Sequence, residues 1–215
     1  MTLPAPAASA LLRAERWADL SVLVSGFLLG VAGAAVVLAV AFARSDTRLI
    51  LSIGIYVVGL LAMLGSSLAY HAAAGSPRRW LLRRLDHAGI FAMIAGSATP
   101  FALCGSAPVW GIAVTLALWA AAAVGMVVKL RSPIGRPKRS VIIYLTLGWF
   151  SVIAIGPSIP AVTALRIAAG GILYTVGVGF YLWRRLPFHS AIWHGLVLAG
   201  ATCHYWAIVD GVVFA

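Results

Sequence analysis

The stretch FHSAIWHGLVLAGATCHY, residues Phe188–Tyr205, opens the last apolar run of the chain and carries three of its five histidines. These three are His189, His194 and His204. An ionisable side chain at membrane depth is costly, so such a residue marks a functional site by default. The stretch therefore predicts a membrane-spanning segment with a functional site near its start.

The composition around this stretch is that of an integral membrane protein. Hydrophobic residues make up 62% of the chain and charged residues 10%, whereas a soluble domain has about 25% charged residues. The apolar runs are about 20 residues long, which is the length of a helix that crosses a bilayer. The alternating ten-residue pattern of a membrane barrel is not found in the sequence. The sequence thus predicts an all-α membrane bundle.

Seven apolar runs qualify as spans, which gives a seven-transmembrane-helix bundle. We expect the spans near residues 20–43, 49–73, 86–104, 109–130, 140–157, 160–183 and 191–215. No linker or low-complexity block divides them, so residues 1–215 are expected to form one domain. Residues 1–18 are expected to form a short segment ahead of the first span.

The basic residues fall mainly on one side of these spans. One side has Arg13, Arg16, Arg78, Arg79, Arg83, Arg84, Lys129, Arg131, Arg136, Lys138, Arg139, Arg184 and Arg185, and the other has Arg44, Arg48 and Arg166. The positive-inside rule therefore predicts a cytoplasmic N-terminus and an outside C-terminus, in the inner (plasma) membrane of the cell. Loop charges also explain the net charge of +11, so we expect no nucleic-acid partner.

The ionisable residues inside the spans cluster at one depth. His71 ends the second span, Asp86 begins the third, and His189 and His194 begin the seventh, all at the predicted cytoplasmic end. Ser67 lies one helical turn before His71 and shares its face. Capping of the third helix is the alternative role for Asp86, because an aspartate near a helix start satisfies free amides.

These residue types suit a zinc site. Imidazoles from His71 and His194, with Asp86 and Ser67 nearby, would hold Zn²⁺ with an open position and an acid–base partner. His204 lies ten residues beyond His194, about 15 Å along a helix, so it cannot share that ion. We expect His204 to make a buried hydrogen bond to a neighbouring helix.

Three blocks of the sequence resemble the signature blocks of bacterial hemolysin III proteins, members of the progestin and adipoQ receptor family. The blocks are SSLAYH (66–71), LDHAGIFAMIAGSATPF (85–101) and FHSAIWHGLVLAGATCHYWAI (188–208). ERWADLSVLVSG (15–26) resembles the first-span block, with Leu23 where a histidine is often found. The resemblance implies a seven-helix bundle with a cytoplasmic N-terminus.

The resemblance also implies a ligand set. Receptor relatives bind zinc through one histidine of the second helix and two of the seventh, spaced H-x-x-x-H, with an aspartate near a bound water. These positions fall on His71, Ser190, His194 and Asp86, and Ser190 departs from the pattern. His189 is its neighbour, but five residues place His189 about 140° around a helix from His194. We therefore expect His71 and His194 to contribute more to zinc binding than His189.

Function remains open between three hypotheses at this point. The first is a zinc-dependent hydrolase of lipid-like esters or amides, or a role in membrane lipid homeostasis, with membrane lipids as partners. The second is a cytolytic pore former, which the family name implies. The third is a sensor or receptor-like protein without catalysis. Few polar residues line the spans, which disfavours a pore, whereas the sequence does not separate the enzyme from the sensor, nor does it give the oligomeric state.

Overall fold

The structure, a computed structural model, describes residues 5–131 and 137–214, and every regular element in these ranges is helical. Seven of the described helices are long and apolar enough to cross a membrane. They are α1 (Ala5–Ala43), α2 (Thr47–Ala72), α3 (Arg79–Cys104), α4 (Pro108–Arg131), α5 (Pro137–Ile155), α6 (Ala161–Leu182) and α7 (His189–Ile208). A 3-10 turn follows α5 at Gly156–Ser158, and a π-helical turn follows α7 at Val209–Val213. The predicted all-α bundle of seven spans is confirmed.

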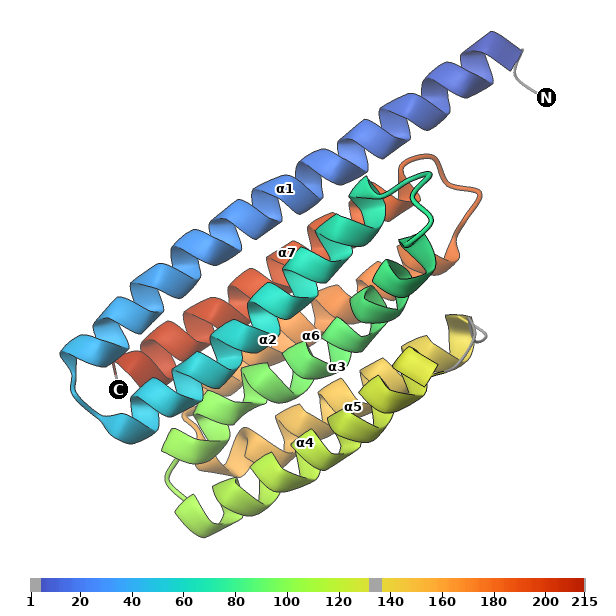
Figure 1. Cartoon of the computed structure of the whole chain (residues 1–215). Helices are drawn as coiled ribbons and strands as arrows, with labels where there is room; N and C mark the ends of the chain where they lie inside the picture. Colours follow the sequence, from blue (N-terminus) through green and yellow to red (C-terminus); the bar gives the residue numbers. More distant parts are fainter. Residues whose placement is uncertain (1–4, 132–136, 215) are drawn as a thin grey trace.

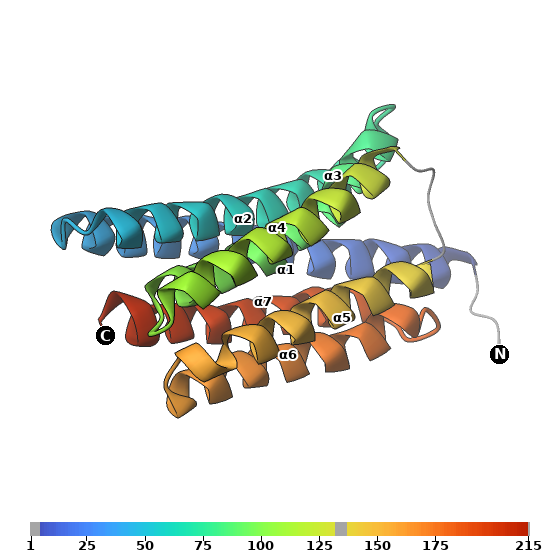
Figure 2. The ribbon, with the colours of Figure 1, turned by 90° about the horizontal axis from the view of Figure 1, so that it is seen from below.

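The helices form an up-and-down bundle whose two termini lie at opposite ends (Figure 1). α3 packs most extensively against α2 and α4, and α6 packs against α7. α1 lies on the outside of the bundle, where its main neighbours are α2 and α7 (Figures 1 and 2). This arrangement brings the start of α7, the end of α2 and the N-terminal half of α1 to the same end of the molecule.

The core lies along α2 and α3. Tyr56, Phe91 and Phe101 are the largest side chains that are almost fully enclosed. A glycine permits the close approach of these two helices, because a Cβ on Gly59 would lie 2.7 Å from the carbonyl oxygen of Ala92. Small residues at helix crossings let backbones pack closely inside membranes, where van der Waals contact drives association.

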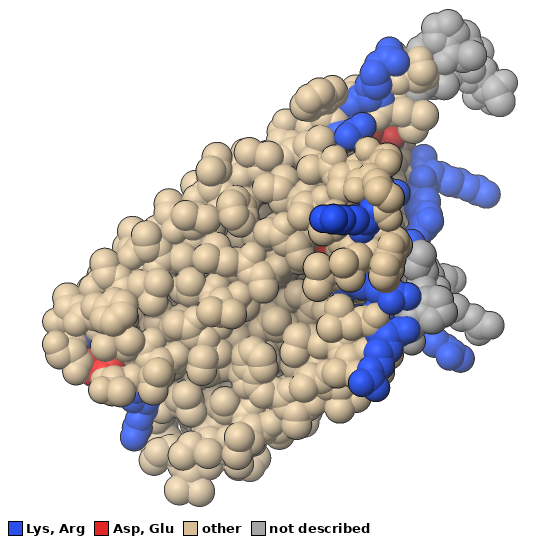
Figure 3. All heavy atoms as spheres, viewed as in Figure 1, with Lys and Arg blue, Asp and Glu red and all other residues tan. Residues whose placement is uncertain are grey.

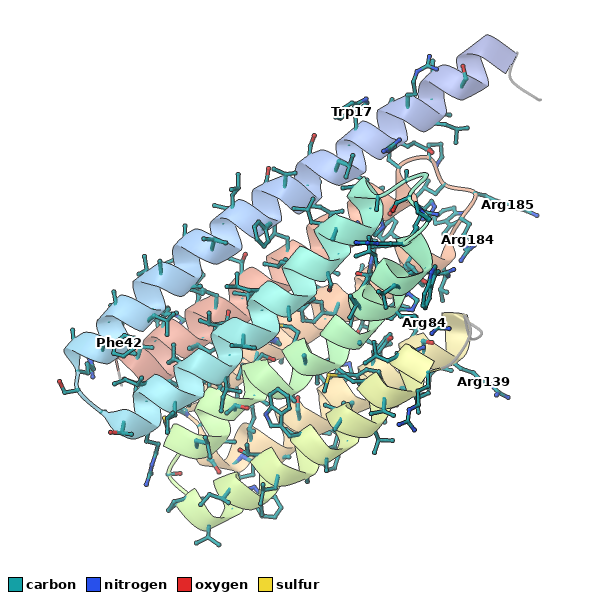
Figure 4. The ribbon with its side chains drawn as sticks, viewed as in Figure 1. Trp17, Phe42, Arg84, Arg139, Arg184 and Arg185 are labelled. Atoms are coloured by element: carbon teal, nitrogen blue, oxygen red, sulfur yellow. The ribbon has the colours of Figure 1, made fainter. Side chains whose placement is uncertain are left out.

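Two helices begin earlier than the apolar runs predict. α1 begins at Ala5 instead of near residue 20, and α3 begins at Arg79 instead of near residue 86. The added segments carry charges, but Arg, Leu and Ala are strong helix formers. An apolar run therefore marks the part of a helix that matches the hydrocarbon core of the membrane, and the helix itself can extend beyond that run. In the added part of α1, Trp17 is 69% exposed and points away from the bundle (Figure 4).

Charge is concentrated at one end of the bundle, which we call the basic end. Figure 3 shows most of the Lys and Arg side chains gathered there and few along the flanks. Arg84, Arg139, Arg184 and Arg185 all lie at this end (Figure 4). Arg136 and the side chain of Lys138, which belong to the predicted charge count, lie outside the described residues. The positive charge is thus distributed unevenly between the two ends of the bundle, and the basic end is the one predicted to face the cytoplasm.

Candidate metal centre

Three metal-donor side chains from three helices converge at the basic end. They are Asp19 of α1, His71 of α2 and His194 of α7, and one donor atom from each lies within 4.8 Å of the others. His194 Nδ1 lies 2.6 Å from Asp19 Oδ1, and His71 Nε2 lies 3.7 Å from Asp19 Oδ2. The two imidazole rings meet edge to face, with centroids 4.7 Å apart. We call these three residues the His–Asp cluster.

The ring of His71 is held by its own helix. His71 Nδ1 lies 2.9 Å from the backbone carbonyl oxygen of Ser67, one turn earlier on α2. A carbonyl oxygen only accepts, so Nδ1 carries the proton and donates it. The lone pair of Nε2 is then free on the side that faces Asp19. A histidine whose other nitrogen donates to a carbonyl in this way has the orientation and basicity of a metal ligand.

The start of α7 is fastened to α1 by two acidic side chains. Phe188, just before α7, has a left-handed backbone with φ 59°, and its N–H donates to Glu15 Oε1 at 3.0 Å. Asp19 lies one turn after Glu15 and contacts His194 in the second turn of α7. These contacts orient His194 toward α2 and set the position of α7 along the axis of α1.

The cluster is enclosed, and no described Lys or Arg forms an ion pair with its carboxylate. The side chains of Asp19 and His194 are 9% and 10% exposed, and that of His71 is 20% exposed. Among the described residues, the ion-pair partners of Asp19 are these two histidines alone. A buried charge is costly unless it is paired or coordinates a metal. A divalent cation between the three donors would balance the Asp19 carboxylate.

The donor set fits zinc. Two imidazoles and one carboxylate are the three protein ligands of a common catalytic zinc site, in which the fourth position stays open. Calcium and magnesium prefer oxygen donors, and only one of the three side chains offers oxygen. The nitrogen donor His71 is also hydrogen-bonded on its far side, which zinc-binding histidines almost always are.

An internal cavity of about 450 Å³ adjoins the cluster. Its polar end is lined by Ser67, His71, Asp86 and His194, and its deep end reaches His204. Between them the walls are mostly apolar, with contributions from every helix except α4. The volume lies within the range of about 300–1,000 Å³ that is usual for small-molecule sites.

The structure brings His71 and His194 together, as the sequence predicts. Asp86 lines the same cavity and lies within electrostatic range of His71, but it is not one of the three clustered donors. Its carboxylate has no hydrogen-bond or ion-pair partner among the described residues. Its catalytic role therefore remains a prediction, and its carboxylate is available at the polar end of the cavity.

The other predicted site residues line the cavity too. Ser67 contacts His71 through its backbone carbonyl, so the predicted catalytic role of its hydroxyl remains a prediction. His189 lies outside the three-residue cluster, and its buried Nδ1 has no hydrogen-bond partner in the described part of the chain. Ser190, at the position where the resemblance implied a histidine, faces the carboxylate of Asp19.

His204 lies deep in the bundle, away from the cluster. Its Nε2 lies 3.1 Å from the carbonyl oxygen of Ile167 on α6 and donates to it. The ring of Tyr174 meets it edge to face at 5.5 Å. The predicted hydrogen bond to a neighbouring helix is confirmed.

Asp19 is the site residue that the sequence analysis missed. The first span was predicted to begin near residue 20, which left Asp19 in the segment before the membrane. The useful signal was its place one residue before an apolar run and four residues after Glu15, within ERWADLSVL. An acid at that depth follows the same rule that marked the histidines.

Seven membrane-length helices, with a candidate metal site beside an internal cavity, define a multi-pass membrane protein. The family model described as Haemolysin-III related matches residues 23–205. The chain therefore belongs to the haemolysin III-related family, which the blocks of the sequence indicated.

Two relatives from Bacillus show the same relationship over most of the chain. The "Hemolysin-3 homolog" of Bacillus subtilis (strain 168) is 32% identical over 163 residues, which are 74% of this chain and 76% of that protein. "Hemolysin-3" of Bacillus cereus is 32% identical over 158 residues, 72% of each chain. No solved structure matched the chain.

Proposed function

We propose that Asp19, His71 and His194 bind one Zn²⁺ and that the protein is a metal-dependent hydrolase of lipid-like esters or amides. One observation carries the proposal: the two histidines of the cluster line the polar end of a cavity whose remaining walls are mostly apolar. Such a cavity suits an amphiphile whose scissile bond stops at the polar end. We place the protein in the plasma membrane with the basic end in the cytoplasm, following the charge count.

The positions of the polar and apolar lining residues along the bundle axis support a lipid-like substrate. His71, Asp86 and His194 mark one level, and below it Ile94 and Leu198 line the walls toward His204. The separation of His194 from His204 along α7 is about 15 Å, which is deep enough for much of an acyl chain. A carbonyl at the top of such a chain lies next to the donors.

The chemistry divides between the metal and the residues. Bound zinc supplies a Lewis acid that polarises a carbonyl and makes water a better nucleophile. Asp86 would take the proton of the attacking water as the oxygen of that water bonds to the carbonyl carbon. The same proton then passes to the leaving oxygen or nitrogen as its bond to that carbon breaks. Asp86 suits this role because its carboxylate is not engaged by another residue of the described chain, and a positioned acid–base group contributes about 10²–10⁴-fold.

Two other functions remain candidates of the same family. A sensor would use the same zinc and cavity to hold a lipid without cleaving it, and it would act in membrane lipid homeostasis through that binding. The Bacillus cereus relative is named for haemolysis, so lysis of red cells is the third function to test. The apolar lining of the cavity favours an acyl chain over a column of water.

The test uses the purified full chain in lipid nanodiscs. The hydrolase predicts about one zinc per chain and release of fatty acid from ester or amide lipids, and His71→Ala should lose both. His204→Gln is the matched control for the metal, because His204 lines the cavity outside the cluster. Zinc with no release from any lipid would contradict the hydrolase in favour of the sensor, and lysis of red cells by the purified protein would favour the cytolysin.

A further inference from the structure

Three pairs of adjacent arginines belong to the basic end, and in two of these pairs one member lines the cavity. Arg83 of α3 and Arg184, which follows α6, are lining residues, whereas Arg84 and Arg185 are not. Arg84, Arg184 and Arg185 are seen at this end in Figure 4. The cavity lining therefore includes two arginines that the charge pattern of the sequence does not distinguish from their neighbours.

Arg84 also differs from the two lining arginines in its side-chain partners. The guanidinium of Arg84 donates to the carbonyl oxygen of Leu130 at 2.9 Å and lies over the ring of Trp80 at 4.8 Å. The guanidinium groups of Arg83 and Arg184 have no hydrogen-bond, ion-pair or ring partner among the described residues. Asp86 lies one turn from Arg83 on α3, yet the two form no ion pair. Both lining guanidinium groups thus have all their donors available.

These cations lie at a defined level of the cavity. Arg83 precedes Asp86 by three residues, about 4.5 Å along α3 toward the basic end. The same cavity is lined by the donors His71 and His194 and by apolar residues that continue toward His204. Lys129 adds positive charge nearby, where its ammonium group donates to the hydroxyl of Ser140, another lining residue.

We propose that Arg83 and Arg184 bind the anionic head group of a single-chain amphiphile, whose chain lies in the apolar part of the cavity. The planar guanidinium pairs with phosphate or carboxylate through two parallel hydrogen bonds. A neutral head would leave these donors without an acidic partner, and a cationic head would be repelled. The volume of about 450 Å³ lies in the lower half of the range for small-molecule sites, which favours one chain over two.

This inference names the substrate class of the proposed hydrolase and rests on that function only for the position of the scissile bond. An ester or amide that joins the anionic head to the acyl chain would lie between the arginines and the apolar walls, at the level of His71 and His194. Binding of the anionic head itself depends on Arg83 and Arg184 and not on the metal.

The test measures binding with probes that contain no carboxylic ester or amide bond for the proposed hydrolase to cleave. The full chain is placed in nanodiscs of phosphatidylcholine and given tritiated 1-O-hexadecylglycerol, the same ether lipid with a 3-phosphate, or palmitate. We expect the phosphate ether to bind about tenfold tighter than the neutral ether, which corresponds to about 1.4 kcal/mol, because charge-assisted hydrogen bonds are stronger than neutral ones. Comparison of palmitate with the phosphate ether tells whether the site favours a carboxylate or a phosphate.

The neighbouring arginines supply the matched control. Arg83→Gln with Arg184→Gln should bring the two ether lipids to near-equal affinity, whereas Arg84→Gln with Arg185→Gln should keep the preference at the same net charge. If the first double variant does not fold, Arg184→Gln alone tests the same point, because this exposed residue lies outside the helices. Equal binding of both ethers by the wild type, or equal loss of preference in both double variants, would overturn the proposal.

The same samples separate this proposal from the proposed function. Zinc is measured on each preparation, and His71→Ala should lose zinc while it keeps the preference for the phosphate ether. A wild type that has the preference but no zinc would contradict the metal-dependent hydrolase and leave the anion site standing. A wild type with zinc and no preference would contradict the anion site alone.

Discussion

The acidic residues at the two ends of the bundle are used in different ways. At the end opposite the basic end, Asp46 caps α2 by accepting from the backbone N–H groups of Arg48 at 2.8 Å and Leu49 at 3.2 Å. Asp210, in the π-helical turn, forms an ion pair with Arg166 of α6. At the basic end, Glu15 accepts from the backbone N–H of Phe188. Asp19 contacts His71, His194 and Ser190, and the Asp86 carboxylate has no hydrogen-bond or ion-pair partner in the described residues.

The difference shows which charges hold the fold and which are available for a ligand. A cap or a surface ion pair satisfies a carboxylate with groups of the protein itself. The basic end holds most of the cations of the chain, yet Asp19 and Asp86 pair with none of the described ones. Neither Asp19 nor Asp86 forms an ion pair with a described Lys or Arg near the cavity, whereas Asp210 pairs with Arg166 at the opposite end. This contrast is what we expect if the basic end is a site and the opposite end is structural.

The largest expected effect concerns the side of the membrane on which each end lies. A reporter that is active only in the cytoplasm, fused to the C-terminus, should give no signal, because the charge split predicts a C-terminus outside. The same reporter on the N-terminus should be active and serves as the control. A strong signal from the C-terminal fusion would place the opposite end in the cytoplasm and remove the positive-inside argument.

The second prediction separates Asp86 from Asp19. Asp86→Asn should lower fatty-acid release by about 10²–10⁴-fold, since it removes the acid–base group, and zinc content should stay at the wild-type level. Asp210→Asn is the control carboxylate at the opposite end, outside the cavity. Loss of zinc in Asp86→Asn would make Asp86 a ligand in place of an acid–base group.

The third prediction ranks the metal donors. Asp19→Asn, His71→Ala and His194→Ala should each weaken zinc affinity by more than about 100-fold, because loss of a supporting residue alone costs about 10–100-fold. His189→Ala should weaken it less, since its ring lies outside the cluster. Zinc titration of the four variants measures this order. Equal losses at His189 and His194 would show that the first turn of α7 rearranges when zinc binds.

The smallest effect is expected at the opposite end. Asp46→Ala removes the cap of α2 and should lower the free energy of unfolding by about 1 kcal/mol, seen as a thermal midpoint a few degrees lower. Asp46→Asn keeps a capping oxygen and should change it little. Both variants should hold zinc as the wild type does, and a loss of zinc in either would show that the two ends are coupled.

The sequence was sufficient for the spans and for the meeting of His71 with His194. Long apolar runs fix the number of spans, and residues at equivalent ends of neighbouring runs lie at one depth. Depth does not determine which way each helix is rotated. Asp86 and Asp19 are both acids near a span end at the same level, and only the packed bundle shows that α1 turns Asp19 toward the histidines.

The first residues of the helices were harder to predict, and for this reason Asp19 was not predicted as a site residue. Hydropathy placed the start of the first span one residue after Asp19, although the helix runs on to Ala5. The role of Glu15 was likewise out of reach, because its hydrogen bond joins residues 173 positions apart. That contact depends on the left-handed backbone conformation of Phe188, which neither composition nor periodicity predicts.

The central claim is that Asp19, His71 and His194 hold one metal ion. X-ray absorption at the zinc edge on the purified wild-type chain tests it most directly, together with the zinc content of the same sample. The account predicts about one zinc per chain, bound only by nitrogen and oxygen at about 2.0–2.2 Å, with two imidazoles among the ligands. A chain that takes up no zinc, or a zinc with a sulfur ligand at about 2.3 Å, would contradict it.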